Sequence, residues 1–259
     1  MGKRMPALFV GHGSPMLALQ HDDITRTLAD LGKRIRTDFG APRGILALSA
    51  HWFTNRTNVQ TDSAPRQIYD MYGFPDELYE VRYPVAGCPA LGQAVLAALG
   101  SAAHENNEWG IDHGTWTPLV HMFPAADVPV TQVSISRALD ARESYAVGQA
   151  LTGLRDEGYL IVGSGNVVHN LRAVDWGNPD GTKAAHAFDD AIQRLVRARD
   201  DEGFFAWERL PQARYAVPTP DHFLPLAYVL GAAEDETAQV FNNVCTLGAL
   251  SMTGYAFGL

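Results

Sequence analysis

Residues 8–19 read LFVGHGSPMLAL, a short apolar run with a polar residue placed where the run ends. The apolar part has the length and composition of a strand that is covered on both faces of a sheet. His12 follows between two glycines, which let the backbone approach a bound group closely. An imidazole at the end of a buried strand indicates a metal ligand, so we expect the other ligands elsewhere in the chain.

The rest of the sequence alternates between strand-like and helix-like segments. Strands are predicted at residues 7–10, 44–50, 128–136 and 159–163, and amphipathic helices at residues 22–37, 89–99, 140–157 and 183–200. The last 20 residues, from Val240, are predicted to form one or two strands that pack back on the sheet. We therefore predict a single α/β domain over residues 1–259, with a central, mostly parallel or mixed sheet flanked by helices on both faces.

The overall composition excludes several classes of protein. The formal net charge of −9 lacks the basic footprint that binding to a nucleic acid needs. The sequence contains no apolar run of about 18 residues, so we predict no membrane span. The apolar stretch near the N-terminus is too short for a signal peptide. The two cysteines form no CxxC motif, which favours a reducing compartment. We expect a cytoplasmic protein, either a monomer or a small homo-oligomer, with no membrane or nucleic-acid partner.

Three of the nine histidines follow predicted strands. They are His12, His51 in LSAHWF (residues 48–53) and His169 in SGNVVHNLR (residues 164–172). A single histidine is more often structural, but the carboxyl ends of parallel strands share one edge, where ligands bind. Imidazole is a common ligand of zinc, iron and copper. The three histidines therefore predict one shared metal site.

Two further histidines leave alternatives open. His222 lies in VPTPDHFLPLAYVLGAA (residues 217–233), where a ligand and an incidental neighbour of a helix-capping Asp221 are equally well supported. His113 lies in a glycine-bracketed loop, WGIDHGTWTPL (residues 109–119), where an acid/base or substrate-binding role competes with a hydrogen-bonded loop residue. The remaining histidines have ordinary contexts; they are His21, His104, His121 and His186.

Residues 69–84, YDMYGFPDELYEVRYP, are dense in aromatic side chains. They suit either a packed surface loop or the wall or lid of a pocket for a flat apolar ligand. Three arginines are candidates to meet a carboxylate on such a ligand: Arg66, Arg82 and Arg172.

Taken together and in this order, these segments resemble one known family. The segments are PALFVGHGSPM, LSAHWF, YGFPDELYEVRYPVAGCPAL, WGIDHGTWTPL, SGNVVHNLR and TPDHFLPLAYVLGA. They resemble the DOPA 4,5-dioxygenase-type branch of the class III, LigB-type extradiol ring-cleavage dioxygenases. The resemblance runs from residue 6 to about residue 255 and implies one α/β domain with a mononuclear metal near a sheet edge.

The resemblance also implies the roles of single residues. His12 and His51 match paired metal ligands, and His222 matches the third ligand. His169 matches a histidine that is either a ligand or the catalytic base, and His113 matches one that binds substrate and assists proton transfer. The cofactor is expected to be one divalent metal per chain, Zn(2+) or Fe(2+), and the substrates a small aromatic diol and O2, giving a muconic semialdehyde-type product.

One departure from the wider superfamily bears on the metal. The LigB-type iron site uses two histidines and a glutamate, whereas this chain offers Asp221 and His222 in the corresponding region. Non-haem Fe(II) oxygenases usually present two histidines and a carboxylate, and an all-histidine set is more typical of zinc. A zinc-dependent hydrolase and a non-catalytic metal-binding relative therefore stand as alternatives to the ring-cleaving dioxygenase.

Overall fold

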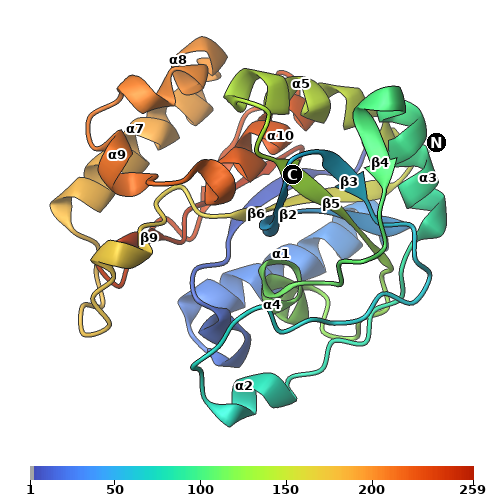
Figure 1. Ribbon diagram of the computed structural model, residues 1–259, viewed down its shortest axis with the longest axis horizontal. Coiled ribbons are helices and arrows are strands. Elements are labelled where there is room, and N and C mark those ends of the chain that lie inside the picture. The colour runs from blue at the N-terminus through green and yellow to red at the C-terminus, as the bar shows by residue number, and fades with distance from the viewer. Residues whose placement is uncertain (1–2) are drawn as a thin grey trace.

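The computed structural model describes residues 3–259, and its centre is a mixed sheet of eight strands (Figure 1). The strand order is β4–β3–β5–β2–β6–β1–β10–β7. Strands β5, β2, β6 and β1 run parallel to one another, and β10 pairs antiparallel with β1. The strand bounds are β1 (Ala7–Gly11), β2 (Gly44–Thr54), β3 (Thr57–Val59), β4 (Ala103–Glu105), β5 (Val130–Ser136), β6 (Tyr159–Gly165), β7 (Gln239–Phe241) and β10 (Gly254–Phe257). A separate small sheet pairs β8 (Cys245–Thr246) with β9 (Leu250–Ser251).

Helices cover both faces of the sheet, which confirms the predicted α/β architecture. In the view of Figure 1, α5 and α10 lie above the sheet, and α1 and α4 lie below it. The lower layer consists of α1 (Asp23–Phe39) and α4 (His113–Met122), with the short α2 (Asp76–Glu80) beyond it. The upper layer consists of α3 (Pro89–Leu99), α5 (Ala141–Leu151), α6 (Gly153–Asp156), α7 (Lys183–Ala198), α8 (Asp201–Phe205), α9 (Ala213–Ala216) and α10 (Leu224–Ala232).

The alternation of side chains along the strands creates two cores, one on each face. In β1, Ala7 and Phe9 pack into the core shared with α5 and α10, whereas Leu8 and Val10 pack into the core shared with α1 and α4. Successive side chains of a strand point to opposite faces, so a continuous apolar run is what a strand covered on both sides requires. The central strands are therefore held rigidly, and their carboxyl ends form a fixed platform.

Several elements differ from the sequence prediction. The helix predicted at residues 140–157 is two helices, α5 and α6, which meet at Thr152. The segment around His113 was predicted as a loop and is the start of α4. The short elements α2, α8, α9, β3 and β4 were not predicted, because elements of three to five residues carry no measurable periodicity. Within residues 3–259, no helix has both the length and the apolar character that crossing a membrane would need.

Candidate metal centre

Five of the nine histidines meet at one edge of the sheet. His12 follows β1 directly, and His169 comes four residues after the end of β6. His51 lies within β2, His113 is the first residue of α4, and His222 ends a 3-10 turn, η5 (Pro220–His222), just before α10. The ring centroids of neighbouring histidines in this group lie 3.5 to 5.8 Å apart. The structure thus brings together every histidine that the sequence singled out.

His51 reaches the group by a different route from the one predicted. The sequence placed it at the end of a strand, but β2 continues to Thr54. The pairing of β2 with β5 shifts register between Ser49 and Phe53, and His51 lies inside this irregularity. Such bulges re-aim side chains beside functional sites. The shift turns His51 out of the regular ladder without ending the strand.

Asp112 fixes the start of α4 and with it the position of His113. Its carboxylate accepts hydrogen bonds from the backbone N–H of Thr115 and from the side chains of Ser49 and Gln132. Burial and the charge of Asp70 raise the pKa of Asp112 to about 6, although the hydrogen bond from Ser49 acts in the opposite direction. This N-cap supplies a partner for an otherwise unsatisfied donor of the helix.

Two glycines allow the elements of the site to touch. A Cβ atom on Gly114 would lie 2.7 Å from Cδ2 of His51, and one on Gly165 would lie 2.1 Å from the carbonyl oxygen of His222. Any side chain at these positions would push α4 away from β2, or the turn that carries His222 away from β6. Both glycines are therefore required for the close approach of the histidines.

Three of the imidazoles are oriented by an oxygen at Nδ1. Nδ1 of His12 lies 2.8 Å from Oγ of Ser164, and Nδ1 of His222 lies 2.5 Å from Oδ2 of Asp221. Nδ1 of His51 lies 3.4 Å from Oδ2 of Asp70. The Ser164 hydroxyl donates its one proton to the carbonyl of Gly114, so it accepts from His12, and the two carboxylates can only accept. The hydrogen bonds at Nδ1 of His12 and His222 therefore place the proton of each ring on Nδ1 and leave a lone pair on Nε2, and the nearby carboxylate of Asp70 favours the same form of His51.

The rings of His12, His51 and His222 lie close together and at similar distances from one another. Nε2 of His12 and Nε2 of His51 lie 3.1 Å apart, and Nε2 of His222 is buried with no hydrogen-bond partner. The ring centroids of these residues form a nearly equilateral triangle with sides of 5.0, 5.2 and 4.9 Å. Rings whose Nε2 atoms bind one ion at about 2.1 Å, at angles between about 90° and 110°, have centroids about 4.5 to 5.2 Å apart. A second partner at Nδ1 that fixes the tautomer is the usual arrangement around a metal-bound histidine, so this set fits a divalent metal.

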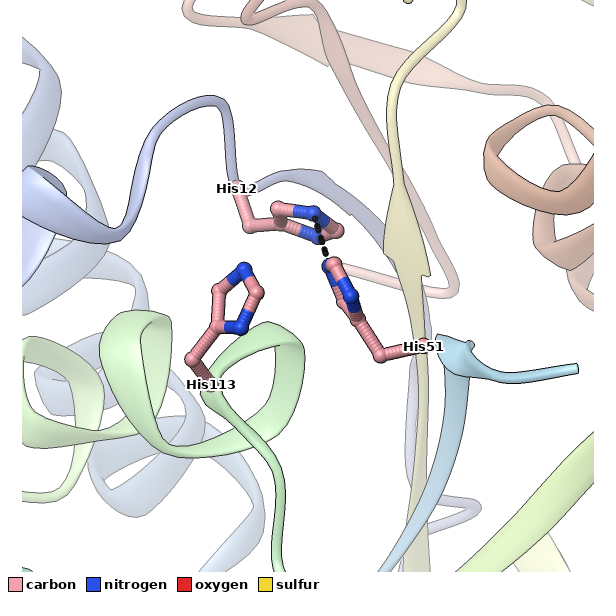
Figure 2. Close-up of side chains that lie close together, drawn as sticks. All are labelled: His12, His51 and His113. Atoms are coloured by element: carbon pink, nitrogen blue, oxygen red, sulfur yellow. Dashed lines mark hydrogen bonds between the residues drawn. The ribbon is translucent and has the colours of Figure 1, made fainter. Parts of the chain in front are cut away.

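His113 lies beside the same space, as Figure 2 shows together with His12 and His51. His12, His51 and His113 also have ligating atoms within 4.8 Å of one another and could hold a metal. The ring of His113 is 3.8 Å from that of His51 but 5.8 Å from that of His12. Its Nδ1 is 3.0 Å from Oδ1 of Asp70 without a hydrogen bond of suitable geometry, and the same oxygen accepts the backbone N–H of His113. Asp70 thus contacts both His51 and His113.

His169 stacks face to face on His222. The two ring centroids are 3.5 Å apart and the planes are inclined by 5°. Ligands of one ion point their lone pairs at a common centre, whereas two parallel stacked rings point them side by side. His169, Asp221 and His222 nevertheless offer ligating atoms within 4.8 Å of one another and form a second group that could hold a metal.

Burial keeps the imidazoles of His12, His51 and His169 neutral. Burial, reinforced by the charge of neighbouring histidines, holds the pKa of His12 and of His51 well below the ordinary value. Burial and the proximity of His222 lower the pKa of His169 to about 2. Neutral imidazole is the form that binds a metal and the form that accepts a proton.

The lowered pKa values predict how the stability of the metal-free protein depends on pH. A histidine whose pKa is lower in the folded state takes up its proton on unfolding, so the free energy of unfolding falls as the pH drops below about 6.5. Each such histidine contributes up to about 1.4 kcal/mol per pH unit. Urea unfolding of metal-free protein at pH 7 and pH 5.5 should show this loss, with a smaller slope in His12→Gln. His104→Gln, at an exposed position in β4, is the control and should keep the wild-type slope; equal stability at both pH values would contradict the expectation.

The histidines open onto a cavity of about 710 Å³. His51, His113, His169 and His222 line its inner end. The aromatic segment predicted as a wall contributes Tyr72 and Phe74, which confirms that interpretation for these two residues. Trp116 and Phe223, by contrast, are fully buried core residues.

Sequence reasoning did not identify the residues that orient the histidines. Asp70 and Ser164 were not singled out, because neither lies near its histidine in the sequence. Asp221 was considered as a helix cap, but no capping hydrogen bond is present and its carboxylate binds His222. Of the residues that orient the histidines, only Asp221 was singled out from the sequence, because it lies next to His222.

Comparisons with known proteins agree with this geometry. The family described as "Catalytic LigB subunit of aromatic ring-opening dioxygenase" matches residues 6–258. The chain is 38% identical to the 4,5-DOPA dioxygenase extradiol of Escherichia coli (strain K12), over 98% of this chain and 95% of that one. It is 34% identical to the 4,5-DOPA dioxygenase extradiol of Beta vulgaris, over 96% and 95%.

A solved structure shares the same fold. The crystal structure of an uncharacterized protein from Escherichia coli K12 superposes with a TM-score of 0.85 at 35% sequence identity, covering 98% of this chain and all of the other. The chain belongs to the LigB family of aromatic ring-opening dioxygenases and is an enzyme of the extradiol class.

Proposed function

We propose that the protein uses one divalent metal and O2 to cleave the ring of a catechol, giving a muconic semialdehyde-type product. The observation that supports the proposal is the near-equal spacing of the His12, His51 and His222 rings beside a cavity, with an oxygen next to Nδ1 of each ring. His12, His51 and His222 are the proposed ligands. Fe(II) is the metal suited to ring cleavage, and Zn(2+) is the alternative that an all-histidine set favours.

The metal, when bound, supplies a positive charge that favours the ionised diol and a single place where catechol and O2 meet. The rest of the reaction needs proton transfers that the chain itself provides. His169 lines the cavity with a neutral ring and takes the proton of the second hydroxyl group. His113, next to the carboxylate of Asp70, binds the substrate and returns a proton as the ring opens. Acid/base groups of this kind are each typically worth about 100- to 10,000-fold in rate.

Hydrolysis by zinc is less well supported by the cavity. A zinc hydrolase commonly pairs its bound water with a free carboxylate as general base. The carboxylates that line this cavity are Asp70 and Asp221, and each is already in contact with an imidazole. No free carboxylate among the described lining residues is available for that role.

Oxygen uptake tests the proposal. Protein purified without oxygen and loaded with Fe(II) should consume one O2 per catechol and form a yellow ring-opened product. The panel should include DOPA, 4-methylcatechol and 3-(3,4-dihydroxyphenyl)propanoate. Hydrolysis of esters without oxygen uptake, or no turnover with any catechol, would contradict the proposal.

The contact between Asp221 and His222 makes a separate prediction about metal affinity. Burial raises the pKa of Asp221, but the hydrogen bond and charge of His222 more than offset this, so the pKa lies below its ordinary value and the group is a carboxylate. Loss of such an orienting partner typically weakens metal binding by about 10- to 100-fold. Asp221→Ala should show this loss in a competition titration with a chelator. Asp76→Ala, on the exposed first turn of α2, is the matched control, and equal affinities for the two variants would contradict the role of Asp221.

A further inference from the structure

The outer end of the cavity has an unusual set of side chains. Tyr72, Leu171 and Trp176 all line it, and they are exposed to 92%, 66% and 68%, although each is large and apolar. They come from two segments, one before α2 and one after β6. Exposed apolar groups gathered around one opening mark a surface that binds something. Arg172 lies among them and lines the same cavity.

The charges in the cavity are distributed unevenly. Arg172 is the only lysine or arginine among the lining residues, and its guanidinium forms no hydrogen bond or ion pair with any residue in 3–259. The two carboxylates of the lining, Asp70 and Asp221, are both in contact with imidazoles. The cavity therefore has a free cation and no free anion.

The other two arginines that the sequence offered for a ligand carboxylate are engaged elsewhere. Arg66 donates to the carbonyl of Glu108, and Arg82 donates to the carbonyl of Tyr79 and lies over the ring of Tyr69. Neither arginine lines the cavity. This leaves Arg172 alone in a position to meet an anionic group on a bound ligand.

We propose that Arg172, flanked by Leu171, Trp176 and Tyr72, is a specificity-determining residue that binds the side-chain carboxylate of a catechol carboxylic acid. The proposal rests on the proposed function, since the diol end is taken to lie at the histidines. A guanidinium binds a carboxylate with two parallel charge-assisted hydrogen bonds, and the apolar side chains cover the linker between ring and carboxylate. A ligand whose side chain carries an ammonium group would find no free carboxylate in the cavity and would face the positive charge of Arg172. Catechol carboxylic acids should therefore bind best, DOPA less well and catecholamines least.

Binding to Zn(2+)-loaded protein in oxygen-free buffer tests this order without turnover. Titration calorimetry would compare 3-(3,4-dihydroxyphenyl)propanoate, 4-methylcatechol and dopamine. In Arg172→Gln, the affinity ratio of the acid to the neutral catechol should fall by about three- to fivefold, the range expected of an ion pair near solvent. In Arg172→Glu the preference should reverse toward dopamine. Arg66→Gln is the matched control and should keep the wild-type ratio.

The outcomes separate this proposal from the proposed function. An unchanged acid-to-neutral ratio in Arg172→Gln, or no gain for dopamine in Arg172→Glu, would overturn the role of Arg172. Oxygen uptake by the Fe(II)-loaded wild type with neutral 4-methylcatechol tests the ring-cleavage function independently of the charge at Arg172. If the acid-to-neutral affinity ratio falls in Arg172→Gln but the wild type takes up no oxygen, the carboxylate site stands and the ring-cleavage function is overturned.

Discussion

His12→Ala is expected to weaken metal binding by more than about 100-fold and to abolish oxygen uptake with catechols. The side chain is fully buried, and its Nε2 lies 3.1 Å from Nε2 of His51. Removing one of three ligands weakens metal binding more than removing an orienting partner does, and loss of an orienting partner typically weakens it by about 10- to 100-fold. Elemental analysis after dialysis, together with a chelator competition titration, measures the loss.

The comparison of His222→Ala with His113→Ala decides whether His222 or His113 is the third metal ligand beside His12 and His51. His222 should behave like His12, because its unpartnered Nε2 and its equal spacing from the other two rings make it the third ligand. His113→Ala should keep the metal and lose rate. Metal loss in His113→Ala with metal retention in His222→Ala would overturn the assignment. Thermal unfolding of each metal-free variant shows whether the chain still folds.

His169→Ala is expected to lower the turnover rate by about 100- to 10,000-fold, the range for a missing general base, while the metal content stays at the wild-type level. The physical reason is the position of His169, which lines the cavity and stacks on His222 outside the proposed set of ligands. Single-turnover measurements of the Fe(II)-loaded protein with 4-methylcatechol, set beside the metal stoichiometry, separate the two effects.

A matched change at another histidine serves as the control for His169. Nε2–H of His121 donates a hydrogen bond to the carbonyl oxygen of Leu17, 2.8 Å away, and His121 does not line the cavity. His121→Ala should keep both metal and rate. Equal metal loss in His12→Ala and His169→Ala would make His169 a ligand and contradict its role as a base.

The sequence predicted the sheet and the clustering of five histidines at one of its edges, for reasons that lie in local patterning. The buried strands carry continuous apolar runs, and α1 shows a clear helical period with Asp22 as its N-cap. His12 was found because it directly follows such a run. The histidines could be assigned to one site although they lie far apart in the sequence, because the carboxyl ends of parallel strands lie at one edge of the sheet.

What the sequence could not predict depends on contacts between distant residues. The register shift that turns His51 outward arises where β2 pairs with β5, and nothing in LSAHWF marks it. The position of Asp70 between His51 and His113 requires the aromatic loop to fold back over the sheet edge. The helix that begins at His113 contains Gly114 and Pro118 and follows Gly110 closely, which obscured its start. These features are set by tertiary structure rather than by local propensity.

The central claim is that Nε2 of His12, His51 and His222 together hold the metal. The most direct measurement is an anomalous difference map from crystals of the Fe(II)- or Zn(2+)-loaded protein, collected at the absorption edge of that metal. We predict one peak within bonding distance of these three nitrogen atoms, with His169 and His113 beside the open side of the ion. A peak bound by His113 in place of His222, or no peak between His12 and His51, would contradict the account.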